Sequence, residues 1–105
     1  MKIHALVLGF GVASNAYTSL LDHNKIKTSV IGSPFDRKKI NILKKTRKDK
    51  SLKLKYSKNI HFYNDNEINL INHDSINLII VGTNTKGIDW AIKILNKLKI
   101  DCPIL

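Results

Sequence analysis

The sequence predicts an α/β fold, in which an open and mostly parallel sheet carries helices on both faces. Three observations predict it: short apolar runs alternate with amphipathic segments, a Gly-x-Gly turn follows the first apolar run, and residues 78–81 are apolar throughout. The alternation is typical of parallel sheets, whose strands are connected by helices. A continuous apolar run is expected of a strand that is buried on both faces. With the glycine turn near its start, the sheet is predicted to be of the Rossmann type.

The first strand is predicted at residues 3–8, directly ahead of the glycine turn. A helix is predicted to follow and to fade at residues 22–24, and the second strand is predicted at residues 28–31. The helix prediction rests on small and apolar residues that recur at helical spacing, namely Ala13, Ala16, Tyr17, Leu20 and Leu21.

A capping pattern marks the start of the second helix. Ser33 is placed as the N-cap, Pro34 at the first helical position, and Asp36 where it completes a capping box with Ser33. The helix is expected to continue to about Lys48, with its lysines facing outward. The residues predicted to face inward are Ile40 and Leu43.

The second half of the chain continues the alternation after residues 50–59, which have no clear period. The remaining predicted elements are a strand at 60–63, about two helical turns at 66–71, a strand at 78–81, a turn at 82–85, a helix marked by Ile88, Ala91, Ile94, Leu95 and Leu98, and the start of a fifth strand at 103–105. We expect residues 1–105 to form one dinucleotide-binding domain that is cut short at the fifth strand.

The composition is that of a folded globular domain. Of the 105 residues, 43% are hydrophobic and 25% are charged, which argues against disorder. No apolar run approaches the roughly 18 residues that a membrane-spanning helix needs. Met1 and Lys2 lead directly into a strand-like run, so no signal peptide is predicted.

Cysteine and histidine usage points away from disulfide and metal chemistry. The single cysteine, Cys102, excludes an internal disulfide and fits a reducing compartment, so we expect a cytoplasmic location. No pair of carboxylates or Ser-centred nucleophile turn is visible, so no catalytic residue is predicted. The four histidines have no metal-ligand spacing, and no metal site is predicted at His4, His23, His61 and His73.

The net charge of +10 lies in one segment of the chain. Residues 37–58 contain 11 lysines and arginines and one acid, Asp49, whereas the rest of the sequence is neutral. Such a segment invites a nucleic-acid hypothesis, because lysine and arginine neutralise phosphates. Only Tyr56 supplies an aromatic ring there, and the lysines lie where a helix shows its outer face. We therefore favour a solvated helix face over a nucleic-acid site.

The glycine turn is the strongest candidate for a binding site. Gly9 would allow a tight turn out of the strand, and Gly11 would remove a side chain where the backbone approaches a pyrophosphate. The amides of Val12 and Ala13 would then point at the phosphates from a helix N-terminus. Ser14 occupies the place of the third small residue that lets the helix pack on the strand. The alternative is an ordinary strand-to-helix turn.

Three loops are predicted to meet beyond the carboxyl ends of the strands, where open parallel sheets bind ligands. They are residues 9–13, 32–35 and 82–85. In the second loop, Ser33 and the basic residues 37–39 would suit a 2′-phosphate and favour NADP slightly over NAD. The alternative is that Ser33 and Asp36 act only as helix caps.

Four segments carry a family resemblance. They are residues 6–11 (Leu-Val-Leu-Gly-Phe-Gly), 31–36 (Ile-Gly-Ser-Pro-Phe-Asp), 52–55 (Leu-Lys-Leu-Lys) and 80–91 (Ile-Val-Gly-Thr-Asn-Thr-Lys-Gly-Ile-Asp-Trp-Ala). Their order and spacing resemble the N-terminal domain of NAD(P)-dependent glycerol-3-phosphate dehydrogenase. The resemblance implies a site for a nicotinamide dinucleotide, NAD or NADP, made by Gly9, Phe10, Gly11, Val12, Ala13, Ser33, Gly82, Thr83 and Asn84. Ser14 departs from the family's usual glycine, and Ser33 from its frequent arginine.

The resemblance also implies what this chain lacks. In the family, one catalytic lysine follows the fifth strand and another lies in a helical C-terminal domain, and both positions fall outside these residues. We therefore expect a cofactor-binding fragment that meets the three-carbon phosphate substrate only if the second domain is supplied. The alternatives are a separate nucleotide-binding module, which could self-associate through an exposed sheet edge, and a basic protein associated with nucleic acid.

Overall fold

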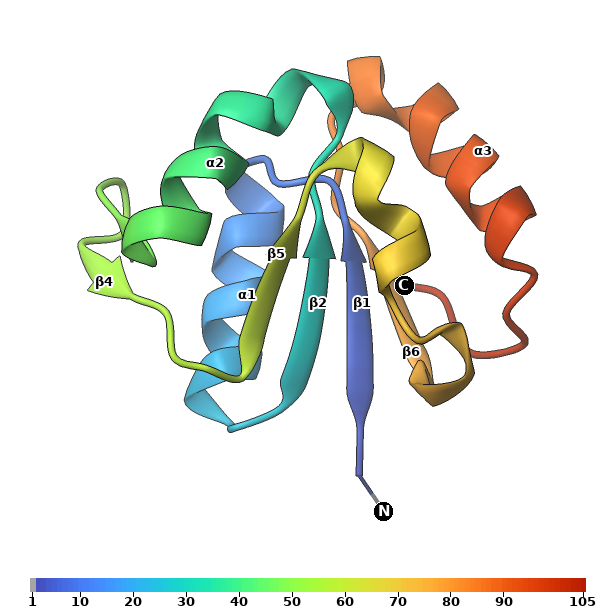
Figure 1. The fold of residues 1–105 in the computed structure, drawn as a ribbon, viewed down its shortest axis with the longest axis horizontal. Helices are drawn as coiled ribbons and strands as arrows, with labels where there is room; N and C mark the ends of the chain where they lie inside the picture. Colours follow the sequence, from blue (N-terminus) through green and yellow to red (C-terminus); the bar gives the residue numbers. More distant parts are fainter. Residues whose placement is uncertain (1) are drawn as a thin grey trace.

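The computed structural model describes residues 2–105, shown as a ribbon in Figure 1. The strands are β1 (His4–Leu8), β2 (Lys27–Ile31), β3 (Lys48–Asp49), β4 (Leu54–Lys55), β5 (Ile60–Tyr63) and β6 (Leu78–Val81). The helices are α1 (Val12–His23), α2 (Arg37–Thr46) and α3 (Ile88–Leu98). Four short 3₁₀ segments complete the chain: η1 (Pro34–Asp36), η2 (Asp65–Leu70), η3 (His73–Ser75) and η4 (Thr85–Gly87).

Four strands form a parallel sheet in the order β5-β2-β1-β6, which confirms the predicted α/β fold. β1 lies in the centre, where Leu6 pairs with Ser29 of β2 on one side and with Ile79 of β6 on the other. The last residues run parallel to β6 through a bridge between Ile79 and Ile104, where a fifth strand was predicted to start. The Leu105 amide donates to the Ile79 carbonyl oxygen at 2.7 Å.

Helices cover both faces of the sheet, as Figure 1 shows. Each face has its own apolar core. Along β1, successive side chains alternate between the two faces because the strand is pleated. Leu6 and Leu8 join the core under α3 and the 3₁₀ segments η2 and η3, whereas Val7 joins the core under α1 and α2. This alternation makes β1 buried along its whole length, as its apolar sequence requires.

The second and third helices form where the sequence predicts them. Ile40 and Leu43 of α2 are buried, as predicted, and Ser33 and Asp36 make the predicted capping box at the start of η1. The helix ends at Thr46, slightly before the predicted Lys48, because Arg47 takes a left-handed conformation with φ of 58°.

The first helix has the predicted extent but presents a different face to the sheet. Its buried residues are Ser14, Asn15 and Thr18. Of the residues whose spacing predicts the helix, Tyr17 and Leu20 are 51% and 60% exposed. The interface between α1 and the sheet is therefore small and polar, and it depends on hydrogen bonds more than on apolar burial.

Residues 50–59 supply a core residue that the sequence did not reveal. β3 and β4 form a short antiparallel hairpin, and Tyr56 directly after it is 1% exposed. Its ring packs edge-on against Phe62 and Phe10, with ring centroids 5.4 and 6.5 Å away. Its hydroxyl donates to the Asn15 carbonyl oxygen at 3.0 Å, so Tyr56 ties the hairpin to α1. Burial raises the pKa of the Tyr56 phenol above its ordinary range.

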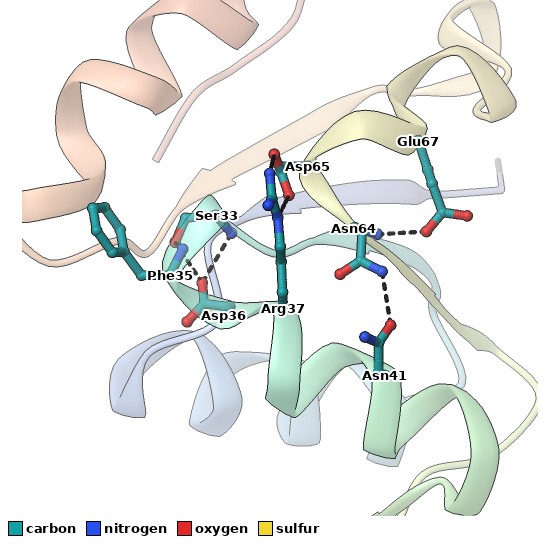
Figure 2. Close-up of polar contacts among 8 residues, drawn as sticks. All are labelled: Ser33, Phe35, Asp36, Arg37, Asn41, Asn64, Asp65 and Glu67. Carbon is teal, nitrogen blue, oxygen red and sulfur yellow. Dashed lines mark hydrogen bonds and ion pairs between the residues drawn. The ribbon is translucent and has the colours of Figure 1, made fainter.

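The turns predicted at residues 66–71 are 3₁₀ rather than α-helical, spanning Asp65–Leu70. Three polar contacts fasten this segment and its N-cap Asn64 to α2. Figure 2 shows two of them: Arg37 pairs with Asp65, and the Asn64 amide nitrogen Nδ2 donates to Asn41 Oδ1 at 2.8 Å. The third is an ion pair between Lys44 and Glu67. None of the helices in residues 2–105 combines the length and apolar character needed to cross a bilayer.

Candidate functional site

The three predicted loops meet at the carboxyl edge of the sheet, beyond β1, β2 and β6. Backbone hydrogen bonds continue the sheet into them: the Gly9 amide donates to the Ile31 carbonyl oxygen at 2.7 Å, and the Gly82 amide donates to the Leu8 carbonyl oxygen at 2.9 Å. The first and third loops are therefore anchored directly to neighbouring strands.

Both the backbone conformation and the close packing at position 9 require a glycine there. Its φ is +88°, a conformation that residues with a Cβ rarely adopt. A Cβ at this position would lie 2.5 Å from the Thr83 side chain, which comes from the third loop. The glycine thus lets the first and third loops touch.

Gly82 makes a second close contact between the same loops. The Ser14 hydroxyl donates to the Gly82 carbonyl oxygen at 2.8 Å, and a Cβ on Gly82 would lie 1.7 Å from Ser14 Oγ. Ser14 is fully buried in this contact. The serine is therefore a structural link between α1 and the loop after β6.

Gly11 differs from these two glycines because little of the protein's own structure lies near it. A Cβ on Gly11 would be 3.7 Å from the Gly82 carbonyl oxygen, an ordinary van der Waals distance. Gly11 is also the N-cap of α1 and offers no side-chain cap. In the part of the chain that the structure describes, the amides of Gly11, Val12 and Ala13 donate to no protein acceptor. These donors face the open edge at a helix N-terminus, where anions are favoured.

The Asp36 carboxylate connects the first and second loops. Its Oδ2 accepts hydrogen bonds from the Phe10 amide at 3.0 Å and from both the amide and the hydroxyl of Ser33 at 2.9 Å. Figure 2 shows Ser33 and Asp36 turned toward each other at the start of η1. Ser33 and Asp36 thus form the capping box, and the Phe10 amide is engaged within the protein. A contact between Ser33 and a cofactor stays a prediction.

Two of the three basic residues after Asp36, Arg37 and Lys39, are directed to protein partners. The Arg37 guanidinium binds both oxygens of Asp65, at 2.9 Å from Nε and 2.8 Å from Nη2, and it holds the pKa of that carboxyl below its usual range. Lys39 Nζ lies 3.4 Å from the Phe10 carbonyl oxygen. The remaining lysines of α2 and the hairpin are exposed, as expected of a solvated face.

A small cavity of about 20 Å³ lies between the loops, lined by Gly11, Ser33, Phe35, Asp36, Thr83 and Asn84. It has room for about one water molecule. Phe35 stands beside it with 67% of its surface exposed, and Asn84 Oδ1 accepts from the Gly87 amide at 3.2 Å. A larger molecule would therefore lie along the open edge rather than in an enclosed pocket.

The structure brings together nearly all the predicted residues. Gly9, Gly11, Ser33, Thr83 and Asn84 lie at one edge, whereas the buried Phe10 ring joins the aromatic cluster and offers only its backbone. The role of Asp36 as a bridge to the first loop was not predicted. Its capping-box position was visible in the sequence, but its partner Phe10 is 26 residues away.

No protein-family model and no curated protein matches this sequence. Among the described residues, no three His, Cys, Asp or Glu side chains are grouped so that they could hold a metal ion.

Proposed function

We propose that this chain binds a nicotinamide dinucleotide along the carboxyl edge of its sheet. It would be the cofactor-binding part of a dehydrogenase resembling NAD(P)-dependent glycerol-3-phosphate dehydrogenase. Two features at the start of α1 carry the proposal. The amides of residues 11–13 have no partner among the described residues, and no contact within the protein explains why residue 11 is a glycine. Both have a use if a ligand's pyrophosphate approaches the backbone at Gly11.

The three loops suit different parts of such a ligand. The pyrophosphate would lie on residues 9–13, and its charge would be favoured by the amides and the dipole of α1. Gly82, Thr83 and Asn84 would border the half of the cofactor that continues past β6. Because contacts between the loops already hold Gly9 and Gly82, the edge needs little rearrangement to receive the ligand.

The second loop favours NAD over NADP. An acidic group after the second strand of such folds accepts a hydroxyl of the ribose, whereas a 2′-phosphate needs a cationic partner. Here the loop presents the Asp36 carboxylate, while Arg37 is paired with Asp65. We therefore propose NAD in place of NADP, which the basic residues 37–39 slightly favour in the sequence, and titration with both cofactors decides between them.

A bound nicotinamide would supply hydride transfer to or from a substrate carbon. The residues of this chain would bind and orient the cofactor. We assign no catalytic residue to them, and a three-carbon phosphate substrate would need groups from a further domain to protonate its carbonyl oxygen.

The test is a calorimetric titration of the purified chain with NADH and with NADPH. Gly11→Val should abolish binding while leaving the fold intact. Its added side chain would occupy open space beside the backbone, where the pyrophosphate is proposed to lie. Ala16→Val is the matched control, since Ala16 is exposed on α1 away from the edge. Equal affinity of both variants and the wild type for NADH would contradict the proposal.

Two further measurements separate the alternatives. NADH oxidation with dihydroxyacetone phosphate should give no turnover by this chain alone, and turnover would show that the chain carries its own catalytic groups. A short DNA duplex titrated at two salt concentrations should bind weakly, whereas tight binding with steep salt dependence would favour a nucleic-acid role for residues 37–58.

A further inference from the structure

The opposite edge of the sheet, where the strands begin, carries a second cluster of polar groups around His4. His4 is the first residue of β1 and is 6% exposed. Its ring lies between two serine hydroxyls: Nδ1 is 2.7 Å from Ser75 Oγ, and Nε2 is 2.8 Å from Ser29 Oγ. Two hollows meet at this ring, one of about 620 Å³ and one of about 190 Å³, and both include His4 and Lys27 in their walls.

The hydrogen bonds determine where the protons of this cluster are. The Ser75 hydroxyl donates its proton to the Asn72 carbonyl oxygen at 2.9 Å, so its oxygen must accept from His4 Nδ1. A neutral His4 therefore carries its proton on Nδ1 and accepts the Ser29 hydroxyl proton at Nε2. In this state Ser29, which lines the smaller hollow, has no proton to offer to a ligand.

The charges around the hollows are all of one sign. His61 of β5 and Lys27 of β2 line the smaller hollow, and Lys2, Lys25 and Lys27 line the larger one; among the described residues, no acid lines either. Burial and the nearby Lys27 lower the pKa of both His4 and His61. Beyond these groups, Arg47 lies near enough to His61 to contribute to that shift. On the η3 side, the His73 ring faces the Ile68 carbonyl oxygen, and Asp74 is exposed outside both walls.

We propose that this amino-terminal edge binds a phosphate-type oxyanion, held by Lys27 and His61, with Ser29 donating a hydrogen bond to it once His4 is protonated. A second proton on His4 would reside on Nε2 and be donated to Ser29 Oγ. The Ser29 hydroxyl proton would then be free to turn into the smaller hollow. Binding of the anion and uptake of a proton by His4 therefore favour each other.

The two hollows suggest the form of the ligand. The smaller one is walled by the groups that would contact the oxyanion, and the larger one continues from it past Ile3 and Ile26. A phosphate carrying an organic group would place its charge in the first and its remainder in the second. This site is at the opposite end of the strands from residues 9–13, so it is independent of the proposed dinucleotide site.

The experiment uses sulfate as its first probe, because the charge of sulfate does not change between pH 5.5 and 8. Titration is followed by the ring signals of His4 and His61 in NMR spectra at constant ionic strength. We expect saturable shifts and an affinity that rises as the pH falls. The rise should reach up to about tenfold per pH unit between the raised pKa of His4 in the complex and the pKa of free His4, and it should level off below the pKa of free His4. Phenyl phosphate should bind more tightly than inorganic phosphate if the larger hollow holds the organic group.

Three variants make the test specific. Ser29→Ala should weaken sulfate binding most at low pH and flatten its pH dependence, and Lys27→Gln should weaken it at all pH values. Lys93→Gln removes the same charge from the outer face of α3 and should have no effect. An affinity independent of pH, or equal losses in Lys27→Gln and Lys93→Gln, would overturn the proposal. If Ser29→Ala unfolds, His61→Gln at an exposed position tests the location of the anion, because it should weaken sulfate binding while the His4–Ser29 pair stays intact. Gly11→Val should leave sulfate binding unchanged.

Discussion

The helices α1 and α3 each follow a glycine loop at the carboxyl edge, but they attach to the sheet in different ways. α3 buries Ala91, Ile94 and Leu98 in an apolar core. α1 buries Ser14, Asn15 and Thr18 instead, and it leaves Leu20 60% exposed. The hydrophobic effect therefore holds α3 on the sheet, whereas close packing and hydrogen bonds hold α1. An amphipathic pattern consequently identifies a helix more safely than it identifies the buried face.

The largest effect is expected from Ile94→Ala in α3. Ile94 is 4% exposed in the apolar core, so the substitution removes buried methyl groups and leaves a cavity. We expect a loss of about 3 kcal/mol in the free energy of unfolding, within the range for such truncations. Urea denaturation followed by circular dichroism measures it. A loss below about 1 kcal/mol would show that α3 is not held mainly by burial.

Gly82→Ala should cost about 2–3 kcal/mol, because the new Cβ would lie 1.7 Å from Ser14 Oγ and 3.2 Å from its Cα. α1 would have to move away from the loop after β6. A double-mutant cycle with Ser14→Gly separates this clash from the helix propensity of glycine. Additive effects of the two substitutions would contradict the close contact.

Tyr56→Phe should cost about 1–2 kcal/mol near neutral pH, because it leaves the buried Asn15 side chain without the phenol as partner. The difference should shrink above about pH 10, the ordinary pKa of a phenol. There the unfolded wild type ionises while the buried phenol, with its raised pKa, remains protonated, so the wild type loses stability that the variant keeps. Unfolding curves at pH 7 and pH 10.5 test both parts. A constant difference would mean that Tyr56 is not buried as a neutral phenol.

Leu20→Ala should change stability by less than about 0.5 kcal/mol, since its side chain is exposed on α1. It is the matched counterpart of Ile94→Ala, as both truncate a four-carbon chain on a helix. Denaturation under the same conditions compares them directly. Similar losses in the two variants would remove the distinction between the helices.

The fold was predictable because its strongest signals are local. The apolar runs of β1 and β6, and the capping pair Ser33 and Asp36, are each contained within a few residues. The face of α1 was not predictable in this way, because Ser14 and Asn15 find their partners 68 and 41 residues further along the chain.

In the candidate site, too, the local features were predictable and the contacts between distant residues were not. The glycine turn and the loops that meet beside it were visible as short motifs. The contact between Asp36 and the Phe10 amide depends on how two loops pack, and no pattern within either loop indicates it. The burial of Tyr56 could not be predicted either, because Tyr56 lies in a lysine-rich stretch whose apolar residues show neither helical nor strand periodicity.

The central position of β1 also has a consequence for how the chain folds. β1 can pair with β2 early, because β2 is close to it in the sequence. Its other neighbour, β6, begins only at Leu78. The hydrogen bond from the His4 amide to Asn77 Oδ1 likewise joins residues that are 73 positions apart. Closing so long a loop costs entropy before the contacts that repay it can form, and parallel sheets of high contact order fold slowly for this reason. During synthesis, one edge of β1 must therefore stay without its partner strand until about three quarters of these residues have been made.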